Sequence, residues 1–162
     1  MTNRQKVALA ARLIVGAVLI YAGASKAAGP VEEFAYVISA YDILPKDFVL
    51  PAAALMPWIE LLVGWALLLG VQTRLAAAAS GALFAAFLTT VGGTLLKGIA
   101  LPNCGCFGDA VHLSPAQAFA MDLVLAGLCW YAYRESENPA SLDSWVEAGY
   151  NSARGQEANP RR

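Results

Sequence analysis

Residues 50–70 read LPAAALMPWIELLVGWALLLG, and this stretch decides the fold. Its only charged side chain is Glu60, and about 20 apolar residues are enough for a helix to cross the hydrocarbon core of a bilayer. Similar stretches lie at about 7–28, 75–96 and 115–134. The sequence therefore predicts an all-α integral membrane protein, a bundle of four spanning helices.

The composition of the 162 residues agrees with a membrane protein. Hydrophobic residues make up 58% and charged residues 14%, whereas soluble domains average about 25% charged residues. A net charge of -1 provides no field that would attract phosphates, so we expect no nucleic-acid partner. Residues 1–134 form the predicted membrane domain. The polar segment 135–162 is expected to be a flexible cytoplasmic tail with at most one short helix near 142–148.

Lysine and arginine residues near the span ends predict the orientation, because positively charged flanks stay in the cytoplasm. If the four spans alternate in direction, one side of the membrane has five positive residues, namely Arg4, Lys6, Arg12, Arg74 and Arg134. The other side has three, namely Lys26, Lys46 and Lys97. This excess predicts a bacterial inner-membrane protein with both termini in the cytoplasm and both long loops, at about 29–49 and 97–114, outside. Cleavage of the first span as a secretory signal is the competing interpretation, which the length of its apolar core disfavours.

The second long loop contains two of the three cysteines, in LPNCGCFGD at 101–109. The compartment outside a bacterial inner membrane is oxidising, so Cys104 and Cys106 are candidates for a reversible disulfide. Cysteines this close can pair only where the chain bends, which Gly105 permits. Such a small ring is expected to be strained and easily reduced, as suits thiol exchange.

Three other interpretations of the cysteine pair stay open. A purely structural disulfide would close almost no loop and so would stabilise little. A metal site could use Cys104, Cys106, Asp109 and His112, but recognisable ligand pairs are missing and we expect no metal. The pair could also be incidental. Cys129, in the fourth span, is expected to be a buried apolar residue, so the chain has one dithiol and cannot by itself form a relay of two pairs.

Ionisable residues inside the spans are the second functional signal. Arg12 is expected to anchor the first span by extending towards the cytoplasm. Glu60 should point into the bundle, with Lys26 as its cation, and Asp122 lies in the same outer half. We predict that Lys26, Glu60 and Asp122 form a polar cluster beneath the cysteine loop, where a cation favours a thiolate and a carboxylate moves protons. The alternative is that these groups only hold the helices together.

Together these features resemble the MauE branch (methylamine utilisation protein MauE) of the DoxX-like membrane proteins. The resemblance covers about residues 8–132. It rests on Arg12, Gly16, Gly23 and Lys26 in the first span, ILP at 43–45, PWIELLVGWALLLG at 57–70 and CGCFG at 104–108. By this resemblance, Cys104 and Cys106 are the redox pair.

The resemblance implies a membrane component that supports disulfide formation in, or maturation of, an extracytoplasmic redox enzyme of the methylamine dehydrogenase type. The implied partner is a thioredoxin-like periplasmic protein or the substrate protein itself. No cofactor motif is visible, and a membrane quinone is a candidate electron acceptor. The alternative function is a non-catalytic membrane subunit or scaffold that docks a partner. Transport of a small apolar ligand is a weaker option, because no pair of broken helices is evident.

Overall fold

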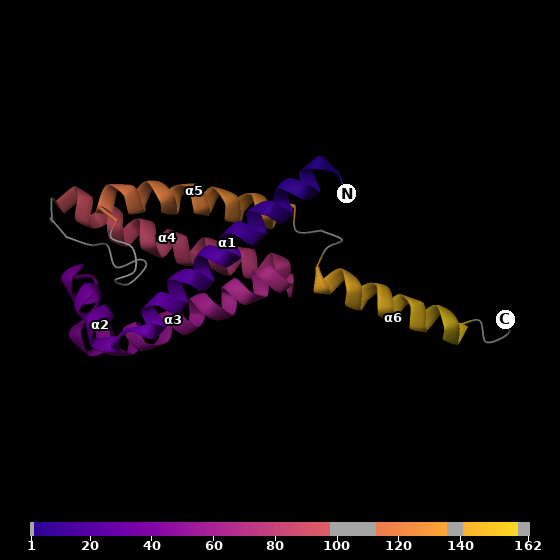
Figure 1. The fold of residues 1–162 in the computed structure, drawn as a ribbon, viewed down its shortest axis with the longest axis horizontal. Coiled ribbons are helices and arrows are strands. Elements are labelled where there is room, and N and C mark those ends of the chain that lie inside the picture. Colours follow the sequence, from indigo (N-terminus) through magenta and orange to yellow (C-terminus); the bar gives the residue numbers. More distant parts are fainter. Residues whose placement is uncertain (1, 98–112, 136–140, 159–162) are drawn as a thin grey trace.

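The computed structural model describes residues 2–97, 113–135 and 141–158, with side chains to residue 151. In chain order the elements are α1 (Asn3–Ala28), α2 (Val31–Ala40), α3 (Lys46–Leu69), α4 (Thr73–Lys97), α5 (Pro115–Arg134) and α6 (Leu142–Ala158). All secondary-structure elements of the described residues are helices, which confirms the predicted all-α class (Figure 1).

Local sequence explains where two of the long helices begin. Thr2 caps α1 and Ser114 caps α5, and each is followed three residues later by a glutamine. The hydroxyl of the cap residue accepts a hydrogen bond from the glutamine N–H, and the glutamine side chain accepts one from the N–H of the cap residue. Pro115 then occupies the first position of α5, where its missing N–H costs nothing. The predicted start of this helix is thereby confirmed.

Helices α1, α3, α4 and α5 form the bundle. The principal packing pairs are α1 with α3 and α4 with α5, and contacts of α1 with α5 and of α3 with α4 join the two pairs (Figure 1). The core contains Val15 and Leu19 of α1, Leu67 of α3, Phe84 of α4 and Leu125 of α5. This small core holds the four helices together.

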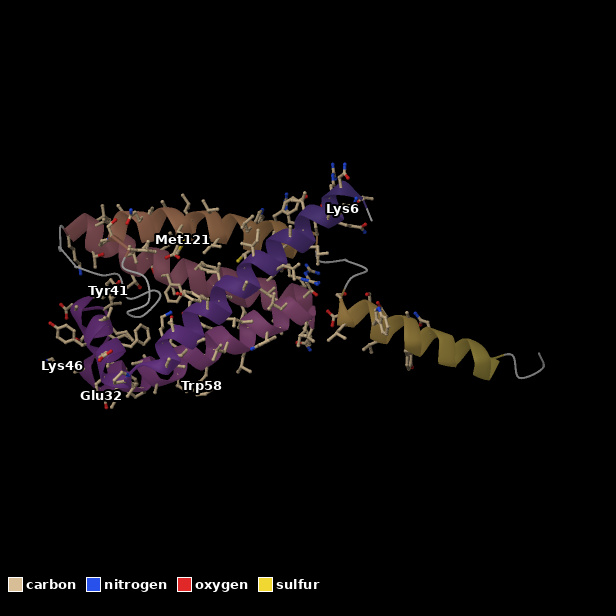
Figure 2. The ribbon with its side chains drawn as sticks, viewed as in Figure 1. Lys6, Glu32, Tyr41, Lys46, Trp58 and Met121 are labelled. Carbon is tan, nitrogen blue, oxygen red and sulfur yellow. The ribbon has the colours of Figure 1, made fainter. Side chains whose placement is uncertain are left out.

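The outer surface of the bundle is apolar. Large side chains such as Leu62 and Val124 are exposed, and Trp58 points away from the bundle (Figure 2). Helices α1, α3 and α4 are long and apolar enough to cross a membrane. The 20-residue α5 contacts α4 extensively (Figure 1). The chain is thus a helical membrane protein, and α5 as the fourth span stays a prediction.

Glycines allow α1 and α3 to approach closely. A Cβ added at Gly16 would lie 3.0 Å from the carbonyl oxygen of Gly64, and one at Gly64 would lie 2.9 Å from the carbonyl oxygen of Gly16. A Cβ at Gly23 would lie 2.7 Å from the carbonyl oxygen of Pro57. Small residues thus bring the two backbones together, as in other membrane helix pairs.

Two segments differ from the sequence-based expectation. The first long loop contains the helix α2, and α3 begins at Lys46, four residues before the predicted span. In the tail, α6 extends to Ala158, well beyond the short helix predicted near 142–148. Figure 1 shows α6 projecting from the bundle at the end opposite α2.

The start of α6 is held at the turn between α3 and α4. Asp143 accepts hydrogen bonds from the backbone N–H groups of Gln72 and Thr73, at 2.9 and 3.0 Å, and from the Thr73 hydroxyl at 3.3 Å. Its own N–H donates to the carbonyl of Gly70 at 3.3 Å. Asp143 therefore satisfies N–H groups that the first turn of α4 would otherwise leave without partners.

Candidate functional site: a buried ion pair beside an apolar cavity

Lys26 and Glu60 form a buried ion pair between α1 and α3. The Nζ of Lys26 lies 2.8 and 2.9 Å from the two carboxylate oxygens of Glu60. The residues are 5% and 0% exposed, so neither charge is solvated by water. The pairing predicted from the sequence is thereby confirmed, and each charge compensates the other where an isolated ion would be costly.

Close packing of the two backbones positions this pair. Gly23 lies one turn before Lys26, and a Cβ there would lie 3.1 Å from the Cβ of Glu60. Lys26 also donates to the carbonyl of Ala22 at 3.4 Å, which directs its side chain along its own helix. Backbone and carboxylate together hold the ammonium group at one place inside the bundle.

Two aromatic rings from other helices face the ammonium group. The Nζ of Lys26 lies 5.5 Å from the ring centroid of Phe34 on α2 and 5.8 Å from that of Phe87 on α4. Both distances are within the range of cation–π attraction. Neither ring was predicted from the sequence. The spacing of Phe34, Ile38 and Tyr41, which follows one helical face, was the signal for α2.

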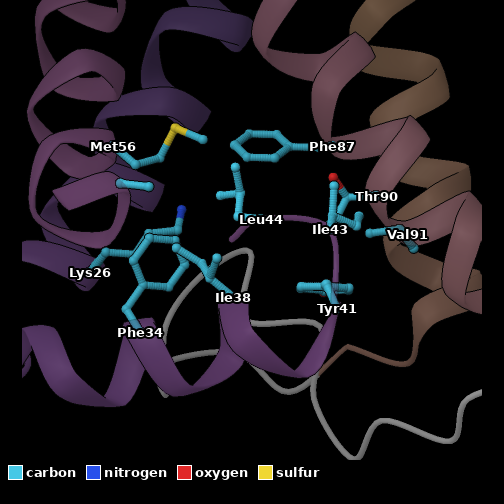
Figure 3. Close-up of a pocket in the computed structure, with 11 residues that line it drawn as sticks. Lys26, Phe34, Ile38, Tyr41, Ile43, Leu44, Met56, Phe87, Thr90 and Val91 are labelled. Carbon is cyan, nitrogen blue, oxygen red and sulfur yellow. The ribbon is translucent and has the colours of Figure 1, made fainter. Parts of the chain in front are cut away.

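These side chains enclose a cavity of about 120 Å³ at the α2 end of the bundle. Among the described residues that line it, nearly all side chains are apolar and Lys26 is the one ionisable amine (Figure 3). The lining residues come from four helices and from the segment between α2 and α3, and include Phe34, Ile38, Leu44, Met56, Phe87 and Thr90. Helix α2 thus covers a hollow that the four-span prediction did not contain.

Of the other residues singled out in the sequence, only some lie within the described ranges. Asp122 is buried on α5, but its membership in a cluster with Lys26 and Glu60 stays a prediction. Cys104, Cys106, Asp109 and His112 lie outside the described residues. Cys129 is buried on α5, as expected. Within the described ranges, no three histidine, cysteine, aspartate or glutamate residues are grouped to hold a metal ion.

The opposite end of the bundle is rich in arginine. Arg12 is 3% exposed, so it is buried and does not extend into water as predicted. Its guanidinium packs beside Gly70, where an added Cβ would lie 2.8 Å from Nη1. Arg74 contacts the ring of Tyr133, and Arg134 that of Trp130. Figure 2 shows Lys6 at this end and Glu32 and Lys46 at the other.

Comparison with known proteins identifies the family. The family model described as "Methylamine utilisation protein MauE" matches residues 4–134, a range that includes Lys26 and Glu60. The chain is also 35% identical over 133 residues to the methylamine utilization protein MauE of Methylophilus methylotrophus, which covers 81% of this chain and 70% of that protein. No solved structure matches significantly. Because both matches span most of the chain, it belongs to the MauE family.

Proposed function

We propose that this protein is a membrane thiol–disulfide redox component of methylamine utilisation, working at the bacterial inner membrane. It supports disulfide formation in, or maturation of, an extracytoplasmic redox enzyme of the methylamine dehydrogenase type. Its family membership and the name of its relative support the pathway. The Cys-Gly-Cys sequence supports the chemistry.

The proposed reaction is a thiol–disulfide exchange. A thiolate of a thioredoxin-like partner or substrate protein attacks the Cys104–Cys106 disulfide and forms a mixed disulfide, with one cysteine of the pair leaving as a thiolate. A second thiolate of the partner then resolves the mixed disulfide. The partner has lost two electrons and gained a disulfide, and Cys104 and Cys106 are left reduced.

The observation that carries this proposal is the buried Lys26–Glu60 pair near one end of the bundle. Lys26 shares a cavity with Thr90 and Val91, in the last two turns of α4, and residues 98–112 connect α4 to α5. The Glu60 carboxylate can take up a proton, and the Lys26 ammonium group is then left uncompensated and favours a thiolate in its neighbourhood. Asp122 is the third proposed member of this cluster.

A trapping experiment tests the exchange. Exchange is reversible, and Cys106 is the resolving sulfur in the reverse direction, in which the Cys104 thiolate attacks the disulfide of the oxidised partner. In Cys106→Ser this mixed disulfide should accumulate and appear on a non-reducing gel as an adduct that dithiothreitol removes. Cys104→Ser is the reciprocal variant. Cys129→Ser is the matched control, because this cysteine is buried on α5 and should leave exchange unchanged.

Two outcomes would contradict the proposal. Thiols at positions 104 and 106 that never become oxidised in cells would exclude disulfide exchange. A pair that is always oxidised and forms no adduct would instead favour the non-catalytic scaffold, in which the loop docks a partner.

A further inference from the structure

The cavity beside Lys26 has the size and the walls of a site for one flat ring. An apolar cavity of about 150 Å³ holds benzene, and this one, at about 120 Å³ and only partly enclosed, is of comparable size. Phe34 and Phe87 present aromatic rings to it from different helices, with Leu44 between them and Met56 beside Phe87 (Figure 3). Aromatic pairs favour stacked or edge-on contacts with another ring.

The charge of the cavity selects a neutral ligand. Its ammonium group is compensated by Glu60 at 2.8 Å, so the charges of the described residues at the cavity cancel while a strong hydrogen-bond donor is present. A carboxylate or phosphate would bring an uncompensated charge into an apolar wall, and a cation would face Lys26. The bond from Lys26 to the carbonyl of Ala22, at 3.4 Å, is the longest of its three described bonds. A hydrogen-bond acceptor on the ligand can replace this bond at the lowest cost in free energy.

We propose that this cavity binds the ring of a membrane quinone, with one quinone carbonyl accepting a hydrogen bond from Lys26. A quinone ring is flat, uncharged and carries carbonyl acceptors, and each property matches a feature of the wall. The residues Ile43 and Leu44 at the cavity are 54% and 42% exposed, so they supply an apolar path to the lipid for a prenyl tail.

The role of the bound quinone rests on the proposed function. When the reduced pair Cys104 and Cys106 is reoxidised, two S–H bonds break and one S–S bond forms. The quinone takes up the two electrons and two protons and becomes a quinol. Binding of the ring itself requires neither cysteine, so the two proposals can fail separately.

The test compares two ligands of nearly the same shape on purified protein in lipid nanodiscs. Duroquinone has no free ring position for thiol addition, and durene is the same tetramethylated ring without carbonyls. Titration of the Cys104→Ser/Cys106→Ser protein, followed by calorimetry, should give tighter binding of duroquinone than of durene. Equal binding of both, or none, overturns the proposal, whatever the trapping experiment shows.

Two substitutions locate the site. Ala52→Phe fills the cavity from α3 and should abolish binding of both ligands. Ala54→Phe, two residues further along, is the matched control, because Ala54 is exposed on the outer face of the helix and should bind as the parent does. Loss of binding in both variants, or in neither, would place the ligand elsewhere and overturn the proposal.

A paired substitution tests the donor. Lys26→Met with Glu60→Leu removes both charges together, a change that is often neutral or stabilising for a buried pair. Duroquinone affinity should fall about tenfold, the value of one hydrogen bond to a charged donor, while durene affinity is unchanged. Unchanged duroquinone affinity would exclude Lys26 as the donor.

Discussion

A buried ammonium group and carboxylate in an apolar bundle are stable only because they contact each other. The sequence predicted the pair Lys26 and Glu60 because ionisable residues are rare inside apolar spans, and the structure places them 2.8 Å apart. The rings of Phe34 and Phe87 could not be predicted, because aromatic residues in an apolar sequence carry no sign of which one faces a charge. The burial of Arg12 depends on packing at Gly70, far away in the sequence.

Gly23 should be intolerant of even the smallest side chain. In Gly23→Ala the new Cβ lies 2.7 Å from a backbone oxygen of α3, so the two helices must separate beside Glu60. Overpacking of this kind costs about 1–3 kcal/mol. Thermal unfolding in detergent micelles should show the loss.

The control for Gly23→Ala is Gly81→Ala on α4, where the new Cβ would lie 3.9 Å from the Cβ of Cys129, an ordinary contact. Its unfolding temperature should not fall. If the two variants unfold at the same temperature, α1 and α3 do not depend on the close approach at Gly23.

At the scale of elements, long apolar helices were predicted and short amphipathic ones were not. The four long apolar stretches are each long enough to span a membrane, and their helices agree with the predicted spans to within a few residues. Helix α2 has only ten residues, and the helical spacing of Phe34, Ile38 and Tyr41 was the signal for it in the sequence. That these three side chains cover a cavity is a tertiary effect that local sequence does not contain.

The contact between α6 and the bundle should depend on the charge of Asp143. Its partial burial favours the neutral acid, but hydrogen bonds from Thr73 and Gln72 and the charge of Arg12 outweigh this and lower the pKa of Asp143. The ionised form therefore stabilises the contact above the ordinary carboxylate pKa of about 4. That stabilisation is lost as the pH falls through the lowered pKa.

Asp143→Ala should release α6 at neutral pH, at a cost on the order of 1 kcal/mol for a lost helix cap. Limited proteolysis checks this, because a released tail is cut faster. Glu147→Ala, an exposed carboxylate on the same helix, should be cut at the parental rate. If the Asp143 variant is also cut at the parental rate, the cap does not hold the tail.

At the scale of the whole molecule, the two ends of the bundle differ in chemistry. Arginines packed on aromatic rings and the start of α6 occupy one end, and the cavity, α2 and Lys46 occupy the other (Figure 2). This separation agrees with the distribution of positive charge read from the sequence. The separation could be predicted because the charges that flank a span are read directly from their positions in the sequence. The cavity could not, because it depends on how four helices and a connecting segment pack.

Fusions should report both termini in the cytoplasm. Green fluorescent protein attached after Arg162 is expected to fluoresce, and alkaline phosphatase attached after Lys97 is expected to be active, because it folds only outside. Phosphatase attached after Arg134 should be inactive. Activity at that position would show that α5 does not cross the membrane, and the bundle would then have three spans.

The cap supplied by Asp143 also bears on where the folding unit ends. The family model stops at residue 134, yet the side chain that completes the first turn of α4 comes from residue 143. The range that matches the family therefore ends before the residues that complete the fold. A protein truncated after residue 134 would lack the cap at the start of α4. The shortest version that keeps this cap must therefore extend into α6.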